Sequence, residues 1–310
     1  MNLLVHKIEK NQVDKNYLDK VEITIEANPG TVTEQKLLDY KKAKVNRLSI
    51  GLQSTNNNLL KEIGRIHDFE QFIKTYSLAR KAGFKNINID LMIGLPNQTI
   101  EDLKDSLEKI IELKPEHISV YSLILEEGTK LYKMVNEGKL NLTEEEYERQ
   151  MYWYVKNTLE LNGYKHYEIS NFAKEGYESK HNLNCWKQKE YLGIGLGASS
   201  YFEGTRYSNV KNLNEYIKNV EAGEYEKNRI VEEVQSEEDK QKEFMMLGLR
   251  MIDGISIQKF KNKFGQNPVY LFKNELDKLV KAKLIIIDGD NIKLTNKGLD
   301  LANQVWMEFA

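Results

Sequence analysis

The sequence predicts an α/β protein with an open, curved parallel sheet, followed by a smaller α+β domain. Three observations support this fold class. Strand-like and helix-like segments alternate through the first half of the chain, and polar and apolar residues alternate within the strands. After about residue 231 the pattern changes to several helices and one hairpin. Alternating strands and helices indicate βαβ units, and the change of pattern indicates a second domain.

Composition excludes several classes of protein. The chain has 310 residues, of which 40% are hydrophobic and 30% charged, and its formal net charge is −2. We therefore expect no global basic field for nucleic acid. We find no apolar run of about 18 residues that could span a membrane, and the first residues are too charged for a signal peptide. Cys185 is the only cysteine, so we expect no disulfide within the chain, no cysteine-built metal site and a cytoplasmic location.

Residues 1–20 have the pattern of a helix end and a linker, and four strands with alternating polarity follow. The strands are expected at 21–27, 47–54, 86–93 and 117–125. Helices are expected between and after them, at about 33–43, 56–63, 69–82 and 99–113. Thr33 is a suitable N-cap for the first helix, and Gly83 is a suitable residue after the end of the third.

The polar side of these strands carries the strongest functional signal. Leaving such groups unpaired in a dry core would cost about 1–3 kcal/mol each. We therefore expect this side to face water or a polar ligand. Glu26, Gln53 and Asp90 lie on it, at or near carboxyl ends of strands, where α/β proteins place their chemistry. The simple alternative for Asp90 is a solvent-facing position on an edge strand.

The middle of the chain mixes helix, strand and loop signals. Residues 143–162 predict a helix that begins with a capping box of Thr143 and Glu146. Residues 164–172 predict a strand, and HNLNCW at 181–186 follows in a polar loop.

The segment YLGIGLGASSY at 191–201 contains alternating glycines. It lacks the strand, Gly-x-Gly-x-x-Gly and helix order of a dinucleotide site, so we expect a close-packed turn beside a ligand.

The last part of the chain predicts a winged-helix-like domain. Three helical patterns precede two short strands joined at Asp288–Asn291, and a final helix begins near residue 296. Such domains often bind DNA, but residues 231–310 hold 12 Lys and Arg against 13 Asp and Glu. We therefore expect a structural or docking role and no nucleic-acid partner.

Seven runs carry a family resemblance over nearly the whole chain. They are EITIEANPGT, VNRLSIGLQS, IGRIH, GFKNINIDLMIGLPNQT, HISVYSLILEEGT, YEISNFA and HNLNCW. In this order they resemble the radical S-adenosylmethionine (SAM) proteins of the oxygen-independent coproporphyrinogen III oxidase group, and most closely its haem-chaperone branch. The resemblance implies a partial, TIM-like (β/α)6 radical SAM barrel over residues 1–165. A connecting region with HNLNCW would span 166–230, and the winged-helix-like domain 231–310.

The resemblance also implies a set of SAM-binding residues. Glu26 and Gln53 would contact the methionine or ribose end, and Asp90 would accept hydrogen bonds from the cofactor. Arg65 would pair with a carboxylate, which suits its planar guanidinium, and Ile124 would pack on the adenine. Without the resemblance, the residues favour a surface ion pair for Arg65.

HNLNCW resembles the HNxxYW motif of the haem-chaperone branch, whose histidine is a proposed haem-binding residue. This implies that His181 contacts haem. Cys185 stands where tyrosine is usual, and a thiolate is itself a haem ligand. From the residues alone, His181 also fits an ordinary loop histidine and Cys185 an inert thiol.

The family begins with a strand, a Cys-x3-Cys-x2-Cys motif that holds a [4Fe–4S] cluster, and a GGGTP loop. None of these occurs in the sequence. We therefore expect an N-terminally truncated member that lacks its first strands and does not ligate the cluster of the full-length family. We name no catalytic residue and no metal ligand, and the sequence leaves open whether the chain is an enzyme.

The resemblance implies a haem chaperone-like protein that binds haem and SAM and passes haem to a membrane-associated acceptor. Two alternatives stay open. One is an oxygen-independent coproporphyrinogen III oxidase, which carries out oxidative decarboxylation in porphyrin biosynthesis. The other is a cluster-free remnant that acts as a binding module.

Overall fold

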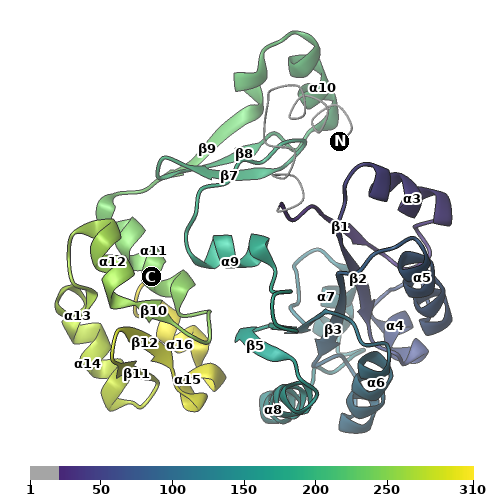
Figure 1. Ribbon diagram of the computed structural model, residues 1–310, viewed down its shortest axis with the longest axis horizontal. Coiled ribbons are helices and arrows are strands. Elements are labelled where there is room, and N and C mark those ends of the chain that lie inside the picture. The colour runs from purple at the N-terminus through teal and green to yellow at the C-terminus, as the bar shows by residue number, and fades with distance from the viewer. Residues whose placement is uncertain (1–20) are drawn as a thin grey trace. The chain divides into compact units, whose positions relative to one another are not determined.

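The computed structural model describes residues 21–310 (Figure 1), which form two compact units that divide after Glu178. The expected helix end and linker at 1–20 lie outside the described residues. The domain boundaries implied at residues 165 and 230 stay predictions. In the described part of the chain, no helix has the length and apolar character needed to cross a membrane.

A six-stranded sheet forms the centre of the first unit, in the order β1-β2-β3-β4-β6-β5. Its first four strands pair in parallel, as predicted: β1 (Thr24–Ala27), β2 (Arg47–Gln53), β3 (Ile87–Ile93) and β4 (His117–Ser122). The expected single strand at 164–172 is wrong. It is a hairpin of β5 (Lys165–Glu168) and β6 (Asn171–Ala173), because residues 169 and 170 form a turn without glycine or proline, and β6 pairs antiparallel with β4.

Helices follow the strands of this sheet, as the element order in Figure 1 shows. They are α3 (Glu34–Lys42), α4 (Asn57–Glu62), α5 (Phe69–Lys81), α6 (Ile100–Glu112), α7 (Lys130–Asn136) and α8 (Glu145–Leu161). The Thr33 hydroxyl caps α3 by accepting from the Lys36 amide, and Gly83 follows α5 with φ of 90°, as predicted. The capping box predicted at Thr143 is wrong, because its hydroxyl instead donates to the Leu95 carbonyl at 3.0 Å.

The apolar side of the sheet packs against these helices. The large apolar residues at alternate positions of β2, β3 and β4 are buried, and each contributes about 1.5–3 kcal/mol through burial. The core includes Leu48, Ile50, Leu52, Ile87, Ile89, Leu91, Ile118 and Val120, with Phe72, Leu107 and Val155 from the helices. The apolar half of the predicted alternation is therefore confirmed.

The second unit begins with a helix where the sequence predicted a loop. HNLNCW lies in α9 (Lys180–Trp186), whose first turn is capped by the Ser179 hydroxyl. A three-stranded antiparallel sheet follows, which sequence analysis missed. It consists of β7 (Ser199–Phe202), β8 (Thr205–Asn209) and β9 (Arg229–Val234), with α10 (Leu213–Glu221) between the last two.

The rest of the second unit has the winged-helix-like pattern. Its helices are α11 (Glu237–Gly248), α12 (Ile257–Phe264), α13 (Pro268–Leu271), α14 (Lys273–Lys281), α15 (Asn296–Asp300) and α16 (Ala302–Met307). The predicted hairpin is confirmed as β11 (Ile285–Asp288) and β12 (Asn291–Leu294), and the short β10 (Ile255–Ser256) pairs with β12. Buried phenylalanines, including Phe260 and Phe272, fill its core.

Candidate functional site

Two rows of polar residues cross the parallel strands of the first unit. Residues that pair in register point to the same side of a sheet. The first row is Glu26, Ser49, Asn88 and His117, and the second is Gly51, Asp90 and Ser119.

Most of the first row is satisfied by its own members. The Asn88 amide donates to Ser49 Oγ at 2.7 Å and to Asp90 Oδ1 at 2.6 Å. His117 Nδ1 lies 2.6 Å from Asn88 Oδ1 and Nε2 lies 2.8 Å from the Tyr167 hydroxyl. Our expectation that the whole polar side faces water or a ligand is therefore wrong at this level of the sheet, because the buried groups pair with one another.

This network fixes the protonation of His117. Asn88 Oδ1 can only accept, so Nδ1 of His117 carries the proton and Nε2 accepts from the tyrosine hydroxyl. Burial, with a smaller effect of the Arg47 charge, lowers the pKa of His117 well below its usual value. His117 is therefore a neutral imidazole that donates to Asn88, which in turn donates to Asp90.

The three residues predicted from the polar pattern, Glu26 of the first row together with Gln53 and Asp90, come together at the carboxyl edge of these strands. Burial raises the pKa of Asp90, and the negative charge of Glu26 adds to the rise. Gln53 Oε1 accepts a hydrogen bond from the Tyr121 hydroxyl at 3.0 Å. Burial raises the pKa of Tyr121 to about 12, and the charges of Asp90 and Glu26 add to this effect. Four side chains from four neighbouring strands therefore share one electrostatic environment.

Local backbone geometry aims Gln53 into this environment. Its φ is 72°, which is rare for a residue with a side chain, and the register with β3 shifts between Gly51 and Gln53. A Cβ on Gly51 would lie 2.9 Å from Gln53 Nε2. Bulges and strained residues of this kind are frequent next to functional sites.

Arg65 reaches the same edge from the segment that follows α4. Its guanidinium donates to Asn28 Oδ1 at 3.1 Å, and its positive charge acts on the Tyr121 hydroxyl. Within residues 21–310 it forms no ion pair with a carboxylate, so the surface ion pair that we considered is not observed there. Its role toward a ligand stays a prediction.

Tyr121 and Asn28 are site residues that our sequence analysis did not single out. The signal for Tyr121 was present, since it lies on the polar side of its strand two residues after Ser119. Asn28 follows Glu26 by two residues, at the turn after β1. Neither was selected because sequence alone does not show which polar groups reach the carboxyl edge.

The other two predicted residues, Ile124 and His181, are both exposed. Ile124 lies two residues beyond β4 and its side chain is 80% exposed. His181 belongs to the second unit, where it is exposed on α9. Its Nε2 is 3.9 Å from the Cys185 sulfur, because residues four apart lie on one face of a helix. Burial raises the pKa of the Cys185 thiol, with the Arg206 charge opposing the rise.

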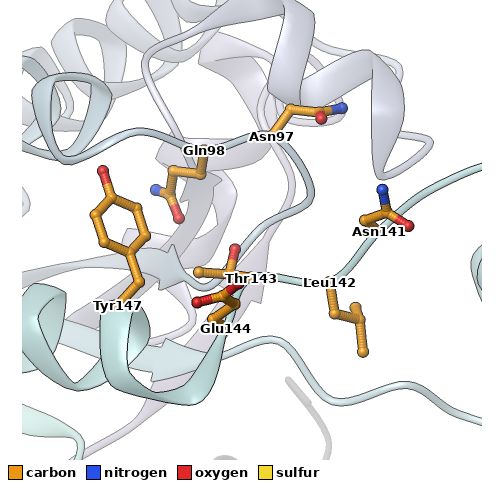
Figure 2. Close-up of a pocket in the computed structure, with 7 residues that line it drawn as sticks. All are labelled: Asn97, Gln98, Asn141, Leu142, Thr143, Glu144 and Tyr147. Atoms are coloured by element: carbon orange, nitrogen blue, oxygen red, sulfur yellow. The ribbon is translucent and has the colours of Figure 1, made fainter.

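A separate cavity of about 330 Å³ lies beside the loop that follows β3 (Figure 2). Its polar side chains have structural tasks. The Gln98 amide donates to the Met92 carbonyl at 3.2 Å, and the Tyr147 hydroxyl accepts from the Ile100 amide at 2.8 Å. These contacts brace the loop against the start of α8, and none of the predicted binding residues lines the cavity.

The described residues of the site suit SAM better than they suit a [4Fe–4S] cluster. Carboxylates, amides, a phenol and a guanidinium at one sheet edge match the donors and acceptors of a charged nucleoside such as SAM. A [4Fe–4S] cluster does not fit the described residues, which contain one cysteine and no group of three possible metal ligands.

Comparisons with protein families define the class. The Radical SAM superfamily matches residues 3–110, and the HemN C-terminal domain matches residues 235–301. Fold, site and both matches together define a radical SAM protein with a HemN-type C-terminal domain.

Comparison with individual proteins narrows this class. "Heme chaperone HemW" of Lactococcus lactis is 43% identical over 298 residues, which cover 96% of this chain and 77% of the relative. "Heme chaperone HemW" of Bacillus subtilis is 41% identical over 299 residues, with shares of 96% and 78%. The chain therefore belongs to the heme chaperone HemW family, which confirms the resemblance seen in the sequence.

A solved structure supports the fold. The coproporphyrinogen III oxidase HemN of Escherichia coli, described as a radical SAM enzyme, aligns with a TM-score of 0.76. The alignment covers 93% of this chain and 69% of the oxidase, at 23% sequence identity. This similarity confirms the partial barrel and the C-terminal domain.

Proposed function

We propose that this chain is a haem-binding protein that also binds SAM, and that it passes haem to an acceptor. The observation that carries this proposal is the similarity to two proteins named heme chaperones over 96% of the chain. The structure adds a motif whose histidine is exposed and a polar sheet edge, which suit the two ligands.

Histidine exposure supports the haem contact. Of the histidines at positions 21–310, three are buried, namely His67, His117 and His166. His181 is exposed. An imidazole is a common axial ligand of haem iron, so His181 is the described histidine that an external haem can reach.

An apolar loop close to α9 in sequence also favours haem. Leu192, Ile194 and Leu196 are large exposed apolar residues in the glycine-rich segment of the same unit. Exposed apolar side chains that follow one another in this way often mark binding surfaces, and the porphyrin of haem is a large apolar plane. Whether the glycine-rich turn lies beside a ligand stays part of the proposal.

We place SAM at the carboxyl edge of the sheet in the first unit. Arg65 would hold its carboxylate, while Glu26, Gln53 and Asp90 would contact its amino group and ribose. Ile124 would cover the adenine. SAM supplies a radical when a [4Fe–4S] cluster reduces it, and we assign this chain no step that uses the cluster, because the described residues do not offer its ligands.

Two further parts of the proposal rest on sequence. The acceptor of haem is a membrane-associated protein, as the resemblance implies, and the chain acts in the cytoplasm. A near-neutral net charge and a single cysteine support this compartment.

The alternative of a coproporphyrinogen III oxidase is less well supported. Its solved representative shares the fold with this chain at 23% identity, whereas the chaperones are 41–43% identical. A cluster-free binding module would share the haem-binding step, and haem transfer to an acceptor would separate it from a chaperone.

Titration of hemin into the full chain tests the haem contact. Wild type, His181→Ala and the control Asn184→Ala are compared by Soret absorbance, since Asn184 is exposed on the same helix. We expect wild type and Asn184→Ala to bind alike, and His181→Ala to bind more weakly with a shifted band. Identical spectra and affinities for all three would reject the assignment.

A further inference from the structure

The helix that carries HNLNCW presents two different faces. His181 and Cys185 lie on one face, where the imidazole and the thiol are 3.9 Å apart. Trp186, the last residue of α9, contacts the C-terminal domain instead. The motif therefore combines a candidate ligand-binding face with an anchor.

The anchor is a stack of one cation between two aromatic rings. The Arg250 guanidinium carbon lies 4.3 Å from the centroid of Trp186 and 4.7 Å from that of Trp306. Arg250 follows α11, and Trp306 lies on α16. Both indole N–H groups are buried without a hydrogen-bond partner among the described residues. The ring faces, and not the ring edges, therefore hold Trp186 in place.

A second anchor follows directly after the helix. Gln188 is buried, and its amide donates to the Lys240 carbonyl at 3.0 Å and to Glu243 at 2.8 Å. Lys263 donates to its side-chain oxygen at 2.8 Å. Residues 186–188 are thus fixed to α11 and α12.

The short length of α9 makes these anchors decisive. It has seven residues, and isolated helices shorter than about 12 residues are marginal in water. Contacts at its C-terminal end therefore help to set its direction, and with it the position of His181 one and a half turns away. At 1.5 Å per residue, Trp186 is about 7.5 Å along the helix axis from His181.

We propose that Arg250 is a positioning residue for the haem contact of His181, acting through Trp186 and Trp306. The proposal deepens the proposed function and rests on it. In this proposal, the HemN-type C-terminal domain fixes the orientation of α9 so that His181 faces the haem.

A double-mutant cycle with hemin tests the proposal on the full chain. The variants are Arg250→Gln, which removes the cation, Arg250→Lys, which keeps it, His181→Ala, and Arg250→Gln with His181→Ala. The control is Arg229→Gln, because Arg229 also stacks on an aromatic ring of the second unit, at 5.2 Å from the centroid of Tyr207, and lies on β9. Circular dichroism and thermal unfolding confirm that each variant folds.

We expect Arg250→Gln to weaken hemin binding about five- to tenfold, the scale of two cation–π contacts of the weaker, partly exposed kind, and to shift the Soret band toward that of His181→Ala. Arg250→Lys should restore part of the affinity, and Arg229→Gln should bind like wild type. The double variant should bind no more weakly than His181→Ala alone, because Arg250 acts through His181.

Three results would overturn the inference. One is an unchanged affinity and spectrum in Arg250→Gln while His181→Ala binds weakly, which leaves the proposed function standing. Another is additive losses in the double variant, which would indicate a general structural effect. The third is a wild type that does not bind hemin, or a His181→Ala variant that binds normally, which would reject the proposed function itself. If Arg250→Gln fails to fold, Trp306→Phe takes its place, with the same expectations.

Discussion

Replacing Asp90 with asparagine changes the charge of the sheet edge while it keeps the shape of the side chain. Asp90 Oδ1 accepts from the Asn88 amide at 2.6 Å, and Oδ2 accepts from the Ser49 hydroxyl at 3.3 Å. An asparagine can accept at one position and donate to the serine oxygen at the other. The variant should therefore fold, and its differences from wild type should come from the missing charge.

The variant should be more stable than wild type at high pH. Burial, followed by the charge of Glu26, raises the pKa of Asp90 in the folded chain. An acid with a raised folded pKa stabilises the fold below its unfolded pKa of about 4, and this contribution is lost as pH rises through the folded pKa. The amide of the variant does not titrate. The free energy of unfolding of the variant should therefore rise relative to that of wild type as pH increases from about 4 through the folded pKa of Asp90.

The same variant should bind SAM more weakly. A lost charge-assisted hydrogen bond costs about 1–3 kcal/mol, which is about 5- to 150-fold in Kd. Urea unfolding at pH 5 and pH 8 measures the stability, and calorimetric titration of SAM measures the affinity. Equal affinities together with equal pH profiles would refute the assignment of Asp90 as a buried carboxylate that faces the ligand.

Three other predictions concern single positions. Burial lowers the pKa of His166 to about 4, so the stability that its neutral form contributes is present above pH 6.5 and is lost as pH falls toward 4. His166→Phe should therefore reduce the slope of the unfolding free energy against pH in this window by about 1.4 kcal/mol per pH unit. An unchanged slope would contradict this. A Cβ at Gly193 would lie 2.3 Å from the Ser199 carbonyl oxygen, so Gly193→Ala should destabilise the chain by about 1–3 kcal/mol in urea unfolding. A variant as stable as wild type would disprove this close packing. Because its pKa is raised, Cys185 is a neutral thiol at pH 7, and Cys185→Ser should change hemin affinity less than about twofold; a tenfold loss would make the sulfur the ligand instead of His181.

The sequence predicted the parallel strands and their helices well, because local signals and packing agree there. Thr33 and Gly83 occupy the cap positions that were expected of them, and the apolar side of each strand is buried. The shared environment of Glu26, Gln53 and Asp90 was also predicted, because residues at the same end of parallel strands with the same parity must meet.

Sequence reasoning failed where polar groups had several partners to choose from. It expected the polar side of the strands, which includes Asn88 and His117, to face water or a ligand, whereas each of these two bonds to neighbours on adjacent strands. It gave Thr143 a capping role, whereas that hydroxyl binds the loop after β3. Such choices depend on groups that are distant in sequence, and no local pattern encodes them.

The anchoring of HNLNCW was hidden for the same reason. Trp186 and Arg250 are far apart in the sequence, and the only helix-start signal is Ser179, which lies before the motif. Only the packed C-terminal domain shows that the motif is a short helix with one anchored face.

Hydrogen–deuterium exchange of the full chain, with and without SAM, tests the central claim that one sheet edge forms a nucleoside site. The account predicts simultaneous protection of the segments after β1, β2, β3 and β4, which carry Asn28, Gln53, Asp90 and Tyr121 or adjoin them. Protection confined to the cavity beside Gln98 and Tyr147, or no protection at saturating SAM, would contradict it.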